Sequence, residues 1–390
     1  MSAPNTDATR TFVGDVDDLH ASAERATGLT EFGPDGDNHR EGLACLLDSL
    51  HADAGLTPEG SKYFRATLKG AIAARLLAED GIARRPEVLG TKVERPIFVT
   101  GLPRTGTTAL HRLLGADPAH QGLELWLTEV PQPRPPREQW DSDPTYTGIR
   151  DLYAGFMTEH PDFGGVHYIS ADDLEECWQL LRQSFTSVSY ECLAYLPSYS
   201  RWLAGADWRP AYARHKRNLQ LIGANDPGKR WVLKNPSHLF ALDALLDVYP
   251  DAVIVHTHRD PVKSMASMCS LAEHAAGTWS TGFTRERIGR TQLELWSRGL
   301  SEFTAARAHH PEATFVDVTH SELLDDAGAA VRKVYAAAGA EYTADIEAAV
   351  IAENAKSLSG ARAPKHSYTL ADYGLSATDV EAAFDGYRGA

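Results

Sequence analysis

Residues 97–108 read Ile-Phe-Val-Thr-Gly-Leu-Pro-Arg-Thr-Gly-Thr-Thr, and this segment decides the fold. The β-branched and aromatic run at 97–100 is typical of a buried strand. The chain breaks at Gly101, and apolar residues at helical spacing over 109–114 predict a helix that begins at about Gly106. A strand, a tight glycine loop and a helix N-terminus together direct free backbone N–H groups at an anion. The segment therefore predicts a phosphate-binding loop.

The sequence of this loop indicates which kind of phosphate ligand it binds. Gly101-x4-Gly106 has the spacing of a nucleotide P-loop, but Thr107 stands where that motif has lysine. We therefore expect a bound phosphate rather than the magnesium-bound triphosphate that the lysine normally serves. The residues expected to contact it are Pro103, Arg104, Thr105, Gly106, Thr107 and Thr108.

Composition limits the partners and the compartment. The 390 residues are 43% hydrophobic and carry a formal net charge of −15, which argues against nucleic acid or an anionic membrane as the main partner. No apolar run approaches about 18 residues, so we expect no stable membrane insertion. The four cysteines are far apart and show no CxxC spacing, as expected of free thiols in a reducing cytoplasm.

The chain reads as one domain with a helical start. Residues 1–14 are polar and predict a disordered tail, followed by a single domain over 15–390. Within it, residues 15–90 predict a helical N-terminal region, with one helix that begins at Thr57-Pro58, because proline suits the first helical turn. Residues 91–390 predict the nucleotide- and acceptor-binding core.

Strands and helices alternate through that core. Residues 231–234, 252–258 and 314–318 predict three further strands, with a helix at 237–249. This alternation predicts an α/β fold: a P-loop-like parallel β-sheet covered by helices, with a helical N-terminal extension and helical insertions. The proline-rich residues 130–145 predict a surface loop, either a connector or a substrate lid.

A second anion signature follows the strand at 252–258. Arg259 ends that strand, where open α/β sheets bind ligands. Asp260 and Pro261 suit the N-cap and first residue of a helix, and Ser267 lies about two turns inside it. An arginine and a hydroxyl so placed can bind a second phosphate.

Together these segments resemble the PAPS-dependent sulfotransferases, and most closely the bacterial branch, which carries Gly-x-Pro-Arg-[Ser/Thr]-Gly-Thr-Thr. The resemblance covers most of the chain and implies that Gly101 to Thr108 bind the 5′-phosphosulfate. It implies that Arg259 and Ser267 bind the 3′-phosphate. Residues 360–368 resemble the C-terminal basic loop of the family, with Arg362 and Lys365 as further nucleotide contacts.

The implied reaction moves a sulfuryl group from PAPS to the hydroxyl of a small, apolar alcohol, phenol or lipid, with PAP as product and no metal. Such a transfer requires positioning of both partners and neutralisation of charge on the leaving phosphate. Arg104 is the natural fixed charge beside the bridging oxygen. Lys234, at a strand end, resembles the catalytic lysine of the family.

The proton acceptor for the hydroxyl is left open between two residues. Glu124 follows the helix of the phosphate loop, at a distance where other branches have a catalytic glutamate. His238 follows the strand at 231–234, close to where the cytosolic branch has a catalytic histidine, although four positions separate it from Lys234.

Two other classes of function also remain open. A P-loop kinase is disfavoured by Thr107, and a non-catalytic nucleotide-binding protein would keep the fold without turnover. The sequence leaves homo-oligomerisation open.

Overall fold

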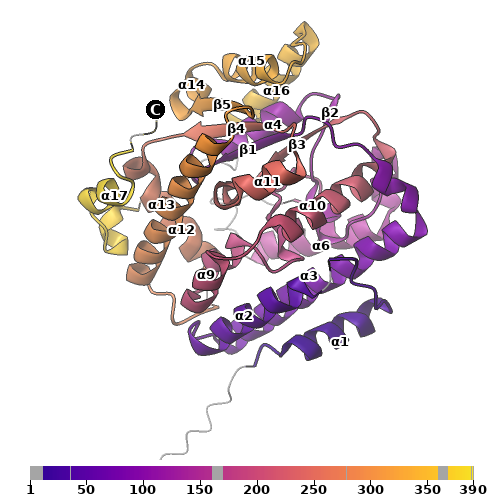
Figure 1. Ribbon diagram of the computed structural model, residues 1–390, viewed down its shortest axis with the longest axis vertical. Helices are drawn as coiled ribbons and strands as arrows, with labels where there is room; N and C mark the ends of the chain where they lie inside the picture. The colour runs from indigo at the N-terminus through magenta and orange to yellow at the C-terminus, as the bar shows by residue number, and fades with distance from the viewer. Residues whose placement is uncertain are drawn as a thin grey trace, which may run out of the picture.

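A five-stranded sheet with strand order β2-β3-β1-β4-β5 lies inside the protein, and every pairing in it is parallel. In the computed structural model, residues 12–35, 37–159, 170–277, 279–358, 368–387 and 389 are described. The strands are β1 (Ile97–Gly101), β2 (His120–Gln121), β3 (Arg230–Lys234), β4 (Val253–His258) and β5 (Thr314–Thr319). Figure 1 shows the sheet edge-on with helices above and below it. The predicted fold class is confirmed.

Residues of the central strand alternate between two hydrophobic cores, as the two-residue period of a strand requires. Ile97 and Val99 pack into the smaller core with β-branched residues of β4 and β5. Phe98 points to the opposite face and packs into the larger core. Because both faces are buried, the strand reads in the sequence as a continuous apolar run.

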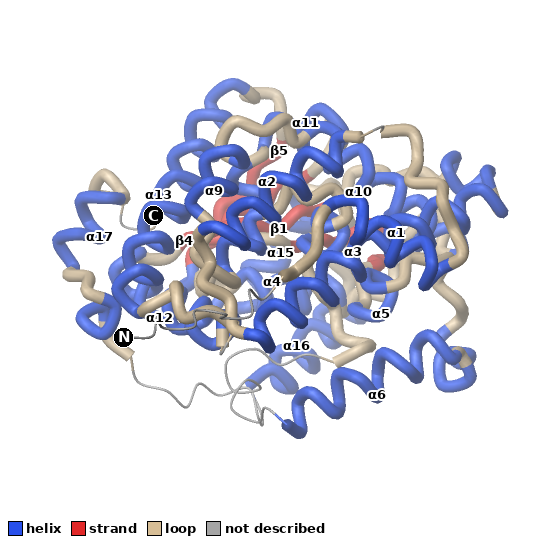
Figure 2. The backbone as a smooth tube through the Cα atoms, turned by 90° about the horizontal axis from the view of Figure 1, so that it is seen from below, coloured by secondary structure: helices blue, strands red, loops and turns tan. Residues whose placement is uncertain are grey.

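Helices cover both faces of this sheet, and Figure 2 shows them enclosing the strands. The helices N-terminal to β3 are α1 (Val16–Thr27), α2 (Asn38–Ala52), α3 (Pro58–Arg84), α4 (Thr107–Gly115), α5 (Leu125–Glu129), α6 (Pro144–Glu159), α8 (Trp178–Arg182), α9 (Pro197–Leu203) and α10 (Arg209–Ile222). Those that follow are α11 (Leu242–Val248), α12 (Pro261–Ala276), α13 (Arg285–His309), α14 (His320–Asp325), α15 (Ala327–Ala337), α16 (Ala344–Leu358) and α17 (Ala377–Ala383). The 3-10 helices are η1 (Pro86–Gly90), η2 (Arg137–Ser142), η3 (Val188–Cys192), η4 (Gly223–Asn225), η5 (Pro236–Phe240) and η6 (Leu370–Tyr373).

The N-terminal helices follow the sequence closely. The predicted helix at Thr57-Pro58 is α3, with the Thr57 side chain capping its first turn. Buried ion pairs join this region to α10, since Asp35 binds both Arg75 and Arg214. Residues 1–11 lie outside the described residues, so the disordered tail stays a prediction, as does the division into domains.

The structure differs from the sequence predictions at three places. The expected helix at 237–249 is split into η5 and α11, because the Asn235 side chain caps a short 3-10 turn first. The two-residue strand β2 was missed, being too short to show a period. The segment 130–145 is not simply a surface loop, because Arg134 and Trp140 within it are buried.

Among the helices that the structure describes, none has the length and apolarity needed to cross a membrane.

Candidate active site

The carboxyl ends of β1, β3 and β4 meet at the centre of the sheet, where the strand order reverses and α/β proteins bind ligands. Gly101 ends β1 with φ +144°, and Gly106 caps α4 with φ +98°. A Cβ on Gly101 would lie 2.4 Å from Thr257 Oγ1, and one on Gly106 would lie 2.8 Å from a Leu323 methyl carbon. Both positions therefore require glycine, and the loop leads into the N-terminus of α4 as predicted.

Arg104 lies at the centre of the second anion signature. It adopts a left-handed conformation with φ +69°, which is rare outside glycine and concentrates at functional sites. Its Nε donates to Ser267 Oγ at 3.0 Å, and its carbonyl oxygen accepts from Arg259 Nη1 at 2.9 Å. Ser267 Oγ also lies 2.8 Å from the Tyr368 hydroxyl. Arg104, Arg259 and Ser267, which are up to 163 residues apart in the sequence, are thus brought together.

This cluster holds two positive charges. Among the described residues, neither Arg104 nor Arg259 forms an ion pair with a carboxylate. Burial, and then the neighbouring charge of Arg104, lower the pKa of Arg259. Two adjacent arginines without an acid between them attract an anion. The geometry therefore fits a phosphate on this side of the loop.

Lys234 lies on the other side of the loop. It ends β3 in register with Val99 of β1, and its side chain is 2% exposed. Its Nζ donates to Thr108 Oγ1 at 3.1 Å and to a carboxylate oxygen of Glu176. The structure thus confirms that Lys234 adjoins the loop. It also adds Glu176, which sequence reasoning missed.

Glu124 lies at the start of α5 and pairs with a different cation, Arg134. Its Oε2 accepts a hydrogen bond from Arg134 Nε at 3.1 Å and lies 3.0 Å from Arg134 Nη2. Burial raises the pKa of Glu124, and the Arg134 charge opposes that rise. The arginine is also bound by Asp226. The role of Glu124 as a proton acceptor stays a prediction.

His238 lies in the larger core, 1% exposed. Its Nδ1 is 2.6 Å from the Tyr212 hydroxyl, and its ring packs edge-on against Phe98. Burial lowers its pKa well below the usual range. It does not cap its helix, a task that the Asn235 side chain performs. A catalytic role for His238 also stays a prediction.

Arg362 and Lys365 lie outside the described residues. One group of described residues could share a metal, since ligand atoms of His256, His258 and Asp317 lie within 4.8 Å of one another. However, Arg307 binds both oxygens of Asp317 at 2.7 and 2.8 Å, and the ion pair lowers the pKa of this carboxyl. The metal-free reaction stays a prediction.

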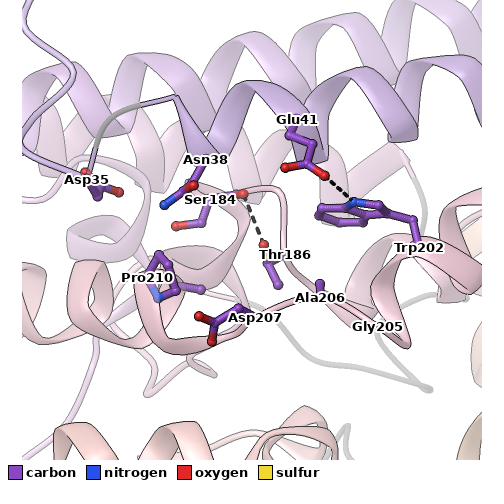
Figure 3. A pocket seen from close by; sticks show the side chains of 11 residues that line it. Asp35, Asn38, Glu41, Ser184, Thr186, Trp202, Gly205, Ala206, Asp207 and Pro210 are labelled. Carbon is purple, nitrogen blue, oxygen red and sulfur yellow. Dashed lines mark hydrogen bonds between the residues drawn. The ribbon is translucent and has the colours of Figure 1, made fainter.

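A cavity of about 380 Å³ opens elsewhere, between α2, the end of α9 and the start of α10 (Figure 3). Asp35, Glu41 and Trp202 are among its lining residues, and the Trp202 indole donates to Glu41 at 3.0 Å. None of the predicted site residues lines it. This cavity is therefore separate from the loop and its arginines.

Sequence comparison agrees with this geometry. The model of the sulfotransferase family matches residues 96–344, which include β1, the phosphate loop, Lys234, Arg259 and Ser267. The chain belongs to the sulfotransferase family and is a sulfotransferase. The resemblance to sulfotransferases inferred from the motifs is confirmed.

Mycobacterial sulfotransferases are similar along the whole chain. Sulfotransferase STF1 from Mycobacterium tuberculosis H37Rv is 52% identical, with a TM-score of 0.90 over 97% of this chain and 100% of that chain. Sulfotransferase STF9 from Mycobacterium avium is 29% identical, with a TM-score of 0.86 over 98% of this chain and 97% of that chain.

One relative is named for its acceptor. The omega-hydroxy-beta-dihydromenaquinone-9 sulfotransferase Stf3 of Mycobacterium bovis is 23% identical over 261 residues, 62% of this chain. The match spans 61% of the length of Stf3.

Proposed function

We propose that this protein transfers a sulfuryl group from PAPS to the hydroxyl of an apolar alcohol, phenol or lipid. The observation that carries the proposal is the cluster of Arg104, Arg259 and Ser267 beside the loop at 101–108. PAPS has two phosphates that need separate sites, and this edge of the sheet offers two: the loop with the α4 N-terminus, and the arginine–serine pair.

The residues predicted to contact the nucleotide then each have a task. Thr105, Gly106 and Thr107 bind the 5′-phosphosulfate with backbone N–H groups, together with Thr108, whose hydroxyl Lys234 reaches, and Pro103, which has no N–H, contacts it as part of the loop. Arg259 and Ser267 bind the 3′-phosphate, and Arg362 and Lys365 are proposed to add charge there.

Two cations serve the transfer itself. Arg104 belongs to the loop, and Lys234 reaches Thr108 of the loop from β3. Both side chains neutralise the charge that develops on the leaving 5′-phosphate. The loop lacks a lysine at position 107, and these two residues supply charge in its place. We propose that the reaction needs no metal.

The acceptor is proposed by similarity. The name of Stf3 gives a hydroxylated menaquinone lipid as its acceptor, and this chain shares 23% identity with it over 261 residues. Aromatic side chains lie on α6 and at the start of α8: Tyr153 on α6 donates to Glu129 at 2.7 Å, and Arg182 stacks on Trp178 of α8, and we propose that this aromatic segment contributes to acceptor binding. We propose an uncharged lipid or phenol, a cytoplasmic location and no nucleic-acid partner.

Transfer of ³⁵S-labelled sulfuryl from PAPS to a panel of alcohols, phenols and isoprenoid lipids tests this function. We expect PAP release and label on at least one apolar acceptor, without added metal and with EDTA present. Tight PAP binding without label on any acceptor would favour the non-catalytic alternative. Phosphate transfer from ATP with magnesium would favour a kinase.

A further inference from the structure

We infer that Glu176 accepts the proton of the acceptor hydroxyl, an inference that rests on the proposed sulfuryl transfer. Glu176 precedes α8 and lies at the carboxyl end of β3, in neither of the positions that the sequence suggested for this role. Three observations support the assignment: its distance from the loop, its fixed backbone, and a free carboxylate oxygen.

Glu176 and the phosphate loop share one ammonium group. Lys234 Nζ binds Glu176 Oε1 and Thr108 Oγ1, so these two oxygens are separated by no more than two hydrogen bonds, roughly 6 Å. Thr108 belongs to the first turn of α4, where the sulfuryl donor is proposed to bind. A hydroxyl that attacks this donor would therefore lie within reach of Glu176.

The backbone on both sides of Glu176 is fixed to the core. Glu175 N donates to Leu123 O at 2.6 Å, and Cys177 N donates to Lys234 O at 3.0 Å. The side chain of Glu176 is 17% exposed, so it is partly buried without being sealed from solvent. A general base requires this combination of fixed position and access.

The other carboxylates and the histidine of this region are engaged elsewhere. Glu129 accepts from Tyr153 and Gln179, both at 2.7 Å, while Glu124 binds Arg134. His238 binds Tyr212 through Nδ1, and its Nε2 is buried without a hydrogen-bond partner among the described residues, but neither atom contacts the loop. In contrast, Glu176 binds the lysine that also reaches Thr108 of the loop, and within the described part of the chain its Oε2 accepts no hydrogen bond. Glu176 therefore has an oxygen that is available to take a proton.

Sulfuryl transfer forms one bond to sulfur and breaks another. The acceptor oxygen forms a bond to sulfur, while the bond from sulfur to the 5′-phosphate oxygen breaks and its electron pair leaves with PAP. The hydroxyl proton passes to Glu176 Oε2 and is then lost to solvent. Lys234 stays bound between the carboxylate and the loop, close to the oxygen that gains charge.

The first test compares Glu176→Gln with Asp172→Asn, a matched loss of an exposed carboxylate four residues earlier. We expect kcat to fall about 10²- to 10³-fold in Glu176→Gln, as for loss of a general base, with PAP affinity within twofold of wild type. Glu176→Asp should recover part of that rate. Asp172→Asn should match wild type.

An ionised acceptor separates proton transfer from a structural role. A nitrophenol that is ionised at the assay pH needs no base, so Glu176→Gln should lose much less rate with it than with an aliphatic alcohol. An equal loss with both acceptors, or wild-type kcat in Glu176→Gln, would overturn the inference. If wild type itself transfers no sulfuryl group, the proposed function fails instead.

Discussion

The two sides of the phosphate loop differ in whether their functional residues belong to local sequence motifs. On the side proposed to bind the nucleotide, Arg104 and Ser267 both occupy motif positions, and Arg104 Nε lies 3.0 Å from Ser267 Oγ. On the proton-accepting side, Glu124 and His238 were chosen by their distance along the chain from a motif, and each binds a different partner. A strand–loop–helix motif fixes its own geometry, whereas the position of a base depends on the packing of distant segments.

Removal of Arg104 should have the largest effect on the nucleotide side. We expect Arg104→Ala to lower kcat about 10³-fold, because the leaving phosphate loses its adjacent charge, while the KM for the acceptor changes little. Steady-state kinetics with saturating PAPS measures both values. Turnover equal to that of wild type would remove Arg104 from the mechanism.

Ser267→Ala should have a smaller effect, confined to binding. We expect PAP affinity to fall about tenfold, since one hydrogen bond to a charged phosphate is lost, with kcat nearly unchanged at saturating PAPS. Ser264→Ala is the matched control, because Ser264 Oγ bonds to Asp260 O within its own helix. Titration with PAP by calorimetry measures both variants, and similar affinities for the two would contradict the 3′-phosphate assignment.

The smallest effect concerns His238 and stability in acid. Burial lowers its pKa in the folded protein, whereas the unfolded imidazole binds a proton below about pH 6.5. Unfolding therefore takes up a proton below that pH, and the free energy of unfolding falls as the pH falls. Relative to His238→Gln, wild type should lose about 1 kcal/mol per pH unit between pH 6 and 5.

Urea unfolding of both proteins at pH 7.5, 6 and 5 measures this difference. A difference that is constant with pH would show that His238 takes up its proton over the same pH range in the folded protein as in the unfolded chain, and would restore it as a group that can titrate during turnover.

The sequence predicted most of the sheet and the nucleotide side. The runs at 97–100, 231–234, 252–258 and 314–318 are rich in apolar residues and coincide with four of the five strands. Arg259 could be assigned because it ends one such strand. Glu176 could not, since it stands in a loop without periodicity, and tertiary contacts such as the Cys177–Lys234 backbone bond bring it next to Lys234.

Burial of polar groups was equally hidden in the sequence. Arg134 stands in a proline-rich stretch that looks exposed, yet it is 8% exposed and pairs with Glu124 and Asp226. A buried arginine requires acidic partners that are buried beside it. Which residues meet in this way depends on tertiary packing rather than on the local sequence pattern.

Nucleotide preference tests the central claim most directly. In calorimetry on the wild-type protein, the account predicts that PAP binds with micromolar or better affinity without metal, and that ATP with magnesium binds at least a hundredfold more weakly. Tight binding of ATP with magnesium, together with no detectable heat from PAP, would contradict the assignment of the loop and of Arg259 to PAPS.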